Sequence, residues 1–273
     1  MKIKSLSVPL FTCWLTAFAF LPFFIIVITS FLEQSEFSLF HFTFTLENYK
    51  ELFSPLFLKI LARSMTIGFV TTFICLVIAL PFCFLMVKSR IKLLLALLVI
   101  IPFWTSSLIR TYALIALLKS HGLINTILLK LHLISTPLNL LYTNTAVMIG
   151  LVYNLLPFMI LPLYAAMERF DFKLIDAAKD LGANPTKILF KVLIPTIMPG
   201  IVSGCILVLL PAMTLFYIPS ILGGAKSILL GNLIQQQVYV LENLPQGAAS
   251  SMILTILLFL LMLIYKQQSR GKL

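Results

Sequence analysis

Long apolar stretches alternate with short polar ones along almost the whole chain. A helix needs roughly 20 apolar residues to cross the hydrocarbon core of a bilayer, and six segments of this chain approach or exceed that length. These segments are about 10–32, 63–87, 93–117, 145–167, 196–218 and 248–265. The pattern predicts an all-α membrane protein with six transmembrane helices.

Pro102 interrupts the third predicted helix, and Pro211 interrupts the fifth. Membrane helices tolerate proline where neighbouring groups satisfy the freed carbonyl, so we expect both spans to continue through it. The first apolar run follows Met-Lys-Ile-Lys. It is longer than that of a signal peptide and lacks a small-residue cleavage site, so we interpret it as an uncleaved first helix.

Composition supports the membrane class. Of the 273 residues, 60% are hydrophobic and 11% are charged, whereas about 25% of the residues of a soluble domain are charged. The net charge is +11, but the basic residues lie mainly between and beside the apolar runs. There they set topology and meet anionic headgroups. Membrane lipid is therefore an expected partner, and nucleic acid is not.

Lys and Arg are unevenly distributed among the polar segments. They are more numerous near both termini, around residues 88–92 and in the loop 168–195 than in the outer loops, about 33–62, 118–144 and 219–247. Because cytoplasmic segments carry the excess of Lys and Arg, this bias predicts that both termini are cytoplasmic. An even number of spans agrees with that orientation.

The sequence contains no recognisable catalytic or metal-binding pattern. Its four cysteines all lie inside apolar runs without metal-ligand spacing, and its three histidines share no spacing. A Gly-rich phosphate loop ending in Lys-Ser/Thr is also missing. We therefore expect no metal, no cofactor, no catalytic residue and no enzymatic activity in this chain itself.

The polar loop 168–195 carries the clearest local structure signals. Asp171 is suited to cap a first short helix, whose apolar residues lie at or near Phe172, Ile175, Ala178 and Leu181. Gly182 suits the left-handed position that ends it. Asn184 and Pro185 are typical of the start of a second helix, and Ile188, Leu189 and Val192 continue an apolar face toward the fifth span.

The same loop resembles the Glu-Ala-Ala-x(3)-Gly-x(9)-Ile-x-Leu-Pro motif of ABC importer permeases. The matching positions are Asp176, Ala177, Ala178, Gly182 and Pro195. Asp replaces Glu at 176, Val replaces Ile at 192, and Ile replaces Leu at 194. The resemblance implies a type I ABC importer permease fold, with residues 171–195 as the coupling loop that docks on a separate ATPase.

Further stretches are similar to the B-type permeases of bacterial spermidine/putrescine importers. They are residues 101–113, 150–164 and 194–219, followed by Leu-Gly-Gly-Ala-Lys and Gly-Asn-Leu-Ile. This resemblance implies a multi-pass protein of the bacterial inner membrane that translocates polyamines. The implied partners are a sister permease, two copies of an ATPase and a periplasmic polyamine-binding protein. Within the chain we expect a first helix and periplasmic loop at 1–61, a permease domain at 62–266 and a cytoplasmic tail at 267–273.

A polyamine path calls for aromatic faces and acceptor groups, because cation–π contacts strengthen when desolvated. Trp104, Tyr153 and Tyr217 are the candidates inside the spans, and Glu242 is the candidate acid near the pore mouth. The alternative is that the aromatics pack helices and that Glu242 is a solvated loop acid. Arg110 lies deep in a span, where a charge suggests function. Since it would repel a polycation, we expect a structural or gating role in which it pairs with carbonyls or Glu242.

Gly200 and Gly204 are spaced for close helix packing, and the sister permease is one candidate partner for it. Two alternatives to the function remain on the residues alone. The importer could carry another cationic small molecule. A secondary transporter driven by an ion gradient would need acidic residues inside its spans and a repeated half, and the sequence shows neither.

Overall fold

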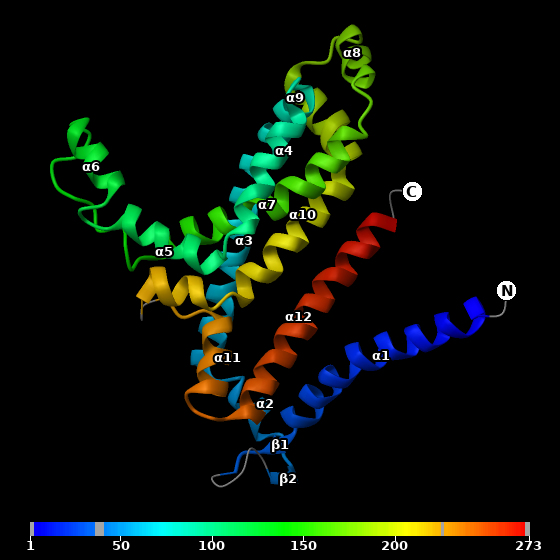
Figure 1. Ribbon diagram of the computed structural model, residues 1–273, viewed down its shortest axis with the longest axis vertical. Coiled ribbons are helices and arrows are strands. Elements are labelled where there is room, and N and C mark those ends of the chain that lie inside the picture. Colours follow the sequence, from blue (N-terminus) through cyan, green and yellow to red (C-terminus); the bar gives the residue numbers. More distant parts are fainter. Residues whose placement is uncertain (1–2, 36–40, 225–226, 271–273) are drawn as a thin grey trace. The chain divides into compact units, whose positions relative to one another are not determined.

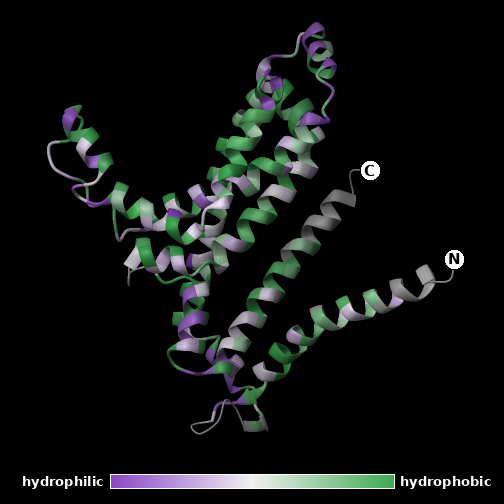
Figure 2. Ribbon diagram, in the orientation of Figure 1, coloured by the Kyte–Doolittle hydropathy of each residue, from purple (hydrophilic) through white to green (hydrophobic). Residues whose placement is uncertain are grey.

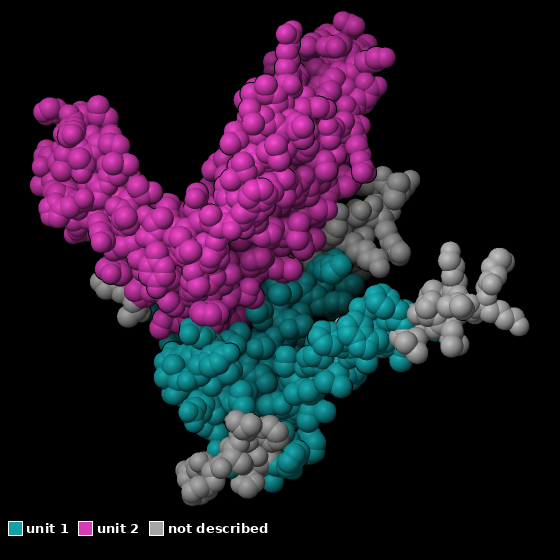
Figure 3. All heavy atoms as spheres, viewed as in Figure 1, with its two compact units in different colours: residues 1–60, 233–273 teal, residues 61–232 magenta. Residues whose placement is uncertain are grey.

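The computed structural model describes residues 3–35, 41–224 and 227–270, most of which are helical (Figure 1). The chain forms two compact units, which are distinguished by colour in Figure 3. One comprises residues 1–60 and 233–273, and the other comprises residues 61–232. This division follows packing, whereas the division into 1–61, 62–266 and 267–273 stays a prediction, and residues 271–273 of the tail lie outside the described residues.

The first unit contains α1 (Ile3–Ser30), β1 (Leu32–Glu33), β2 (His41–Phe44), α2 (Glu47–Glu51) and α12 (Leu244–Arg270). α1 packs against α12, and β1 pairs with β2 in an antiparallel two-stranded sheet. Buried Asn48 fixes the turn from α1 into β1, because its amide donates to the carbonyls of Ser30 at 3.1 Å and Leu32 at 2.8 Å. The expected outer loop 33–62 therefore holds regular structure.

The second unit is a helical bundle. Its elements are α3 (Pro55–Lys88, which begins in the first unit), α4 (Lys92–Ile100), the 3-10 turn η1 (Ile101–Trp104), α5 (Ser107–Leu118), α6 (Leu123–Lys130), α7 (Asn144–Glu168), α8 (Lys173–Asp180), α9 (Pro185–Ile188), the π-helical turn η2 (Leu189–Leu193), α10 (Ile194–Thr214), the π-helical turn η3 (Pro219–Gly223) and α11 (Leu230–Tyr239, which ends in the first unit).

Close packing of α7 and α10 forms the centre of this unit. A Cβ atom on Gly200 would collide with Ala166 and lie 2.9 Å from the carbonyl oxygen of Pro162. A Cβ on Gly204 would lie 2.6 Å from the sulfur of Met159. The glycine pair therefore packs against α7 of the same chain and not against the sister permease that its spacing also allowed.

α3 lies along the same helix α7. The Cys83 thiol lies 3.5 Å from the Ile160 carbonyl oxygen, and the Cys75 thiol lies 4.0 Å from that of Val152. Both cysteines are fully buried. Small side chains thus let α3 approach α7 at two levels along the helix pair.

The third predicted span, 93–117, is not one helix. α4 ends at Ile100, η1 contains Pro102, and Thr105 is extended at φ −95° and ψ 142° before α5 begins. The Pro102 carbonyl accepts bonds from the Thr105 amide and hydroxyl, at 3.2 and 2.8 Å. These bonds stabilise the break, so the prediction of a continuous helix was wrong. Pro211, in contrast, lies inside α10 as expected.

Five helical segments among the described residues are long and apolar enough to cross a membrane. They are Phe11–Ser30, Pro55–Lys88, Ser107–Lys130, Asn144–Glu168 and Pro185–Thr214. Two shorter apolar stretches are Lys92–Trp104 and Leu244–Leu260. A multi-pass helical membrane protein is confirmed, while the number of six spans and the cytoplasmic position of both termini stay predictions.

Candidate functional site

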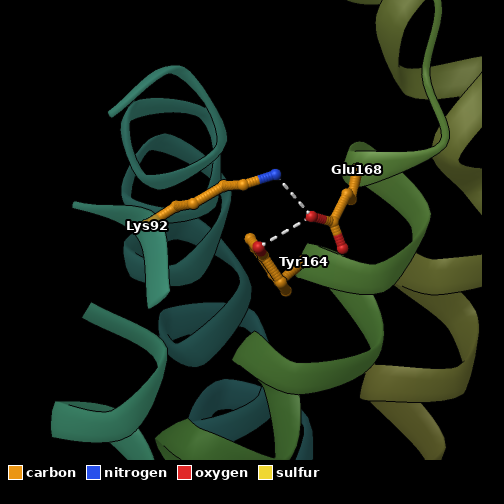
Figure 4. A network of polar contacts seen from close by, with 3 residues as sticks. All are labelled: Lys92, Tyr164 and Glu168. Atoms are coloured by element: carbon orange, nitrogen blue, oxygen red, sulfur yellow. Dashed lines mark hydrogen bonds and ion pairs between the residues drawn. The ribbon is translucent and has the colours of Figure 1, made fainter. Parts of the chain in front are cut away.

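A small polar network joins α4 to the end of α7, where the candidate coupling loop begins. Lys92 Nζ lies 2.8 Å from Glu168 Oε1, and the Tyr164 hydroxyl donates to the same oxygen at 3.1 Å (Figure 4). The Lys92 and Glu168 side chains are about half exposed, so water screens the pair and its stabilising effect is small. Its geometric effect is to position the last turn of α7, from which the chain enters α8.

α8 is capped at both ends by the residues predicted from its sequence. Asp171 Oδ1 accepts a hydrogen bond from the Lys173 amide at 3.0 Å, close to the positive end of the helix dipole. At the other end Gly182 has φ +76°. Its amide donates to the Lys179 carbonyl at 2.8 Å, and the Ala183 amide donates to the Ala178 carbonyl at 3.0 Å. These two bonds make a Schellman motif.

The second half of the loop leads directly into α10. Asn184 Oδ1 accepts from the Lys187 amide at 2.9 Å, and Pro185 occupies the first turn of α9, both as predicted. η2 follows with one wide π-helical turn, and Pro195 lies in the first turn of α10. Ile188 is buried, and Leu189 and Val192 are half-buried. The predicted apolar face toward the fifth span is therefore confirmed.

The loop presents two different faces. On the inner face Ile175 is buried and Ala178 is half-buried, and the Phe172 ring packs 6.1 Å from that of Phe84. On the outer face Leu181 is 88% exposed, although we expected it to continue the apolar face. The reason is that the chain turns into the left-handed Gly182 at this point, so Leu181 no longer follows the helical register.

The motif residues divide between these faces. Asp176 and Ala177 are exposed, Gly182 would have open space around an added Cβ, and Pro195 is exposed. Asp176 Oδ1 lies 3.0 Å from Lys179 Nζ within α8, with both side chains largely exposed. Figure 2 shows hydrophilic residues gathered at α8, in contrast to the mainly hydrophobic α3, α7 and α10. The outer face thus combines small and charged residues with the exposed Leu181, and the turn at Gly182 caps its helix.

A second feature is a cavity of about 400 Å³ at the break between α4 and α5. This volume falls within the usual range of small-molecule sites. Its lining residues come from η1, α5, α7, α10 and the segment after α10. They are Phe103, Thr105, Ser106, Ser107, Arg110, Asn154, Leu155, Phe158, Pro211, Leu215 and Tyr217. None of these described residues carries a carboxylate.

Two polar atoms at this cavity are buried without a hydrogen-bond partner among the described residues. They are Arg110 Nε and Asn154 Oδ1. The Arg110 guanidinium lies 5.7 Å from the centre of the Phe103 ring, which is within the range of a cation–π contact. Glu242 belongs to the other unit. The expected pairing of Arg110 with carbonyls or Glu242, and its gating role, stay predictions.

Of the three aromatic pathway candidates, Tyr217 lines the cavity, and its hydroxyl lies 2.8 Å from Ser107 Oγ. Trp104 is 83% exposed and Tyr153 is 46% exposed, and neither lines this cavity. Glu242 is exposed, with a positive φ of 52° after the end of α11. Ser107 and Phe103 were not selected from the sequence. The Pro102 break was the one signal that could have led to them.

Comparison with known proteins identifies the family. The family described as "Binding-protein-dependent transport system inner membrane component" matches residues 68–271. The spermidine/putrescine transport system permease protein PotB of Haemophilus influenzae is 44% identical over 98% of this chain and 95% of its own length. PotB of Escherichia coli K12 is 45% identical over 94% of each chain.

The structure also resembles solved membrane proteins. One is a chain of a bacterial ABC transporter involved in the import of the acidic polysaccharide alginate. It matches with a TM-score of 0.77 at 14% identity, over 98% of this chain and 96% of that chain. At this identity the match shows the fold alone, which is that of a type I ABC importer permease. The chain therefore belongs to the family of binding-protein-dependent transport system inner membrane components.

Proposed function

We propose that this chain is the permease subunit of an ATP-driven importer of spermidine and putrescine, and that residues 171–195 couple it to a separate ATPase. The single observation that carries the coupling assignment is the outer face of the loop. A rigid cap at Gly182 holds Ala177 and Leu181 outward on a polar surface, with nothing near Gly182 to oppose close approach. The similarity to PotB proteins supports the cargo.

The proposed complex contains a sister permease, two copies of the ATPase and a periplasmic polyamine-binding protein. ATP binding closes the ATPase dimer and moves the coupling loops, and the two permeases then alternate between inward and outward openings. This chain supplies the path and the docking surface, while hydrolysis takes place on the ATPase. The structure of an alginate ABC transporter in complex with an alginate pentasaccharide-bound periplasmic protein supports a periplasmic partner here.

Within the membrane, Tyr217 and Phe158 offer aromatic faces and Asn154 offers an unpartnered oxygen at the cavity. Such groups suit a desolvated ammonium. Arg110 opposes a polycation at the same place, so we propose that it limits how long the cargo stays. Trp104, Tyr153 and Glu242 remain proposed elements of the path outside this cavity.

The test measures ATP hydrolysis by the purified complex with and without polyamine-loaded binding protein. We expect Ala177→Asp to abolish the stimulation, because it places a charge on the docking surface. Thr136→Asp is the control, since it adds the same carboxylate at an exposed position between α6 and α7, outside the coupling loop. If the Ala177→Asp complex is still stimulated by the loaded binding protein, the result would contradict the assignment of this loop to coupling.

The cargo is tested separately on the binding protein and the reconstituted complex. Uptake of labelled spermidine and putrescine that requires ATP supports the proposal. Uptake of a different cationic molecule in preference to both would keep the importer class and change the cargo. Uptake that continues without ATP under an ion gradient would instead support a secondary transporter.

A further inference from the structure

An apolar groove lies beside the coupling loop, apart from the cavity at Arg110. It has a volume of about 560 Å³ and runs between the second half of α3 and the segment from α8 to η2. Leu80 and Phe84 of α3 line one side, and Ile188 and Leu193 line the other. Apart from Lys88 and Lys179, none of its described lining residues has a polar side chain.

The two lysines give the groove a positive rim. Lys179 already has a carboxylate beside it, since its ammonium lies 3.0 Å from Asp176. Lys88 has no carboxylate partner among the described residues. Its ammonium lies 4.2 Å from the centre of the Phe84 ring and 5.5 Å from that of Phe172. Aromatic faces thus hold an unpaired cation at the rim of a hydrocarbon-lined groove.

The position of Lys88 places this rim at a membrane boundary. The last part of α3 before Lys88, residues 73–87, has only apolar side chains, and Lys88, Arg90 and Lys92 follow it. Because basic residues end transmembrane helices at the interface, the groove extends from headgroup depth toward the hydrocarbon. Its charge and its apolar interior are therefore arranged along the membrane normal in the order that a phospholipid presents them.

The chemistry of the lining also argues against a peptide in the groove. An extended peptide carries backbone N–H and C=O groups that need partners when buried, and the groove side chains offer no amide or hydroxyl. An acyl chain has no such requirement. A phosphate, in turn, satisfies the unpaired ammonium, and basic pockets between transmembrane helices are suited to anionic headgroups.

We propose that this groove binds one anionic phospholipid, with its acyl chain against Leu80 and Leu193 and its phosphate at Lys88. The site goes beyond the proposed transport function and does not depend on the cargo. Pro81 of α3 lines one side of the groove, and Leu189 and Leu193 of the π-helical η2 line the other.

The experiment measures lipid binding to the purified permease complex by native mass spectrometry. Phosphatidylglycerol is titrated against phosphatidylcholine with the same acyl chains. We expect the wild-type complex to retain phosphatidylglycerol preferentially, and Lys88→Gln to weaken its binding about fivefold, since one interfacial lysine contributes that much. Lys173→Gln is the matched control, because Lys173 is exposed on α8 and does not line the groove.

A second measurement identifies the occupant directly. A photo-crosslinking benzoylphenylalanine replaces Phe84 in the groove, and the adduct is analysed by mass. A phospholipid adduct supports the proposal. A polypeptide adduct, equal retention of the two lipids by the wild type, or equal weakening by Lys88→Gln and Lys173→Gln would overturn it.

Discussion

In the loop 171–195, each turn is set by residues that lie close together in the sequence, whereas five segments of the chain line the cavity beside Arg110. Asp171, Gly182 and Asn184 each act on backbone groups a few positions away. Arg110 of α5, Asn154 of α7 and Pro211 of α10 meet only because the helices pack. The two regions belong to the same unit, so the difference lies in how far along the chain their contacts reach.

This difference explains which structural features could be predicted from the sequence. A local motif keeps its residue types and spacing because the backbone geometry requires them, so it can be read from one sequence. A cavity between helices is defined by packing, and many combinations of side chains produce one. Changes to the two regions should therefore act on different properties, coupling for the loop and assembly of the bundle for the cavity.

The largest effect on stability is expected from a substitution at a packing contact between helices that are distant in the sequence. Gly200→Leu would place a side chain against Ala166 and the Pro162 carbonyl. We expect it to destabilise the protein by about 3 kcal/mol, as overpacking in a tight contact does. Ser203→Leu is the control, because Ser203 is exposed on the same helix. Melting temperatures in detergent measure both. Equal melting of the two variants would contradict the α7–α10 contact.

The next effect concerns the loop alone. Gly182→Val forces a β-branched residue to φ +76°, which is unfavourable by about 1–2 kcal/mol, although no atom would clash. We expect polyamine-stimulated ATP hydrolysis to fall about tenfold while the melting temperature stays close to that of the wild type. Gly182→Asn should retain most of the stimulation, because Asn tolerates this conformation. Similar activity of both variants would show that the left-handed cap is not needed.

A smaller effect is expected at the cavity. Arg110→Gln removes the cation over Phe103, a contact that contributes about 1 kcal/mol, so polyamine uptake should change about fivefold. Arg110→Lys should have a weaker effect, since it retains the charge. Uptake into proteoliposomes and co-purification of the partner subunits are the two measurements. If uptake and co-purification are both unchanged in Arg110→Gln, the result would contradict a gating or structural role for Arg110.

The smallest effect is expected at the network that precedes the loop. Lys92→Gln breaks the ion pair with Glu168, but the pair is exposed, so stimulated ATP hydrolysis should change less than about twofold. The remaining effect should disappear at high salt, which screens the same interaction. A larger, salt-independent loss would mean that the network positions α7 more firmly than its exposure indicates.

The same contrast describes what the sequence predicted. The fifth-span apolar face, the caps at Gly182 and Asn184 and the span at α7 were predicted because local chemistry determines them. The helix break after Pro102 was not predicted, because Pro102 ends a helix in η1 whereas Pro211 continues one in α10, and only neighbouring packing distinguishes the two. Likewise, Trp104 and Tyr153 were chosen by residue type, while lining of the cavity depends on which way each helix faces.

The π-helical turn η2 has a consequence for the direction in which the loop faces. A π turn accommodates one residue more than the α-helix on either side, so the loop before it and α10 after it are offset by one position. One residue of an α-helix corresponds to a rotation of about 100°. Because the wide turn absorbs the additional residue, a chain lacking exposed Phe190 could form an ordinary helix with the loop and α10 facing as they do now. Without the π turn, the same additional residue would rotate the proposed docking surface by that angle relative to α10.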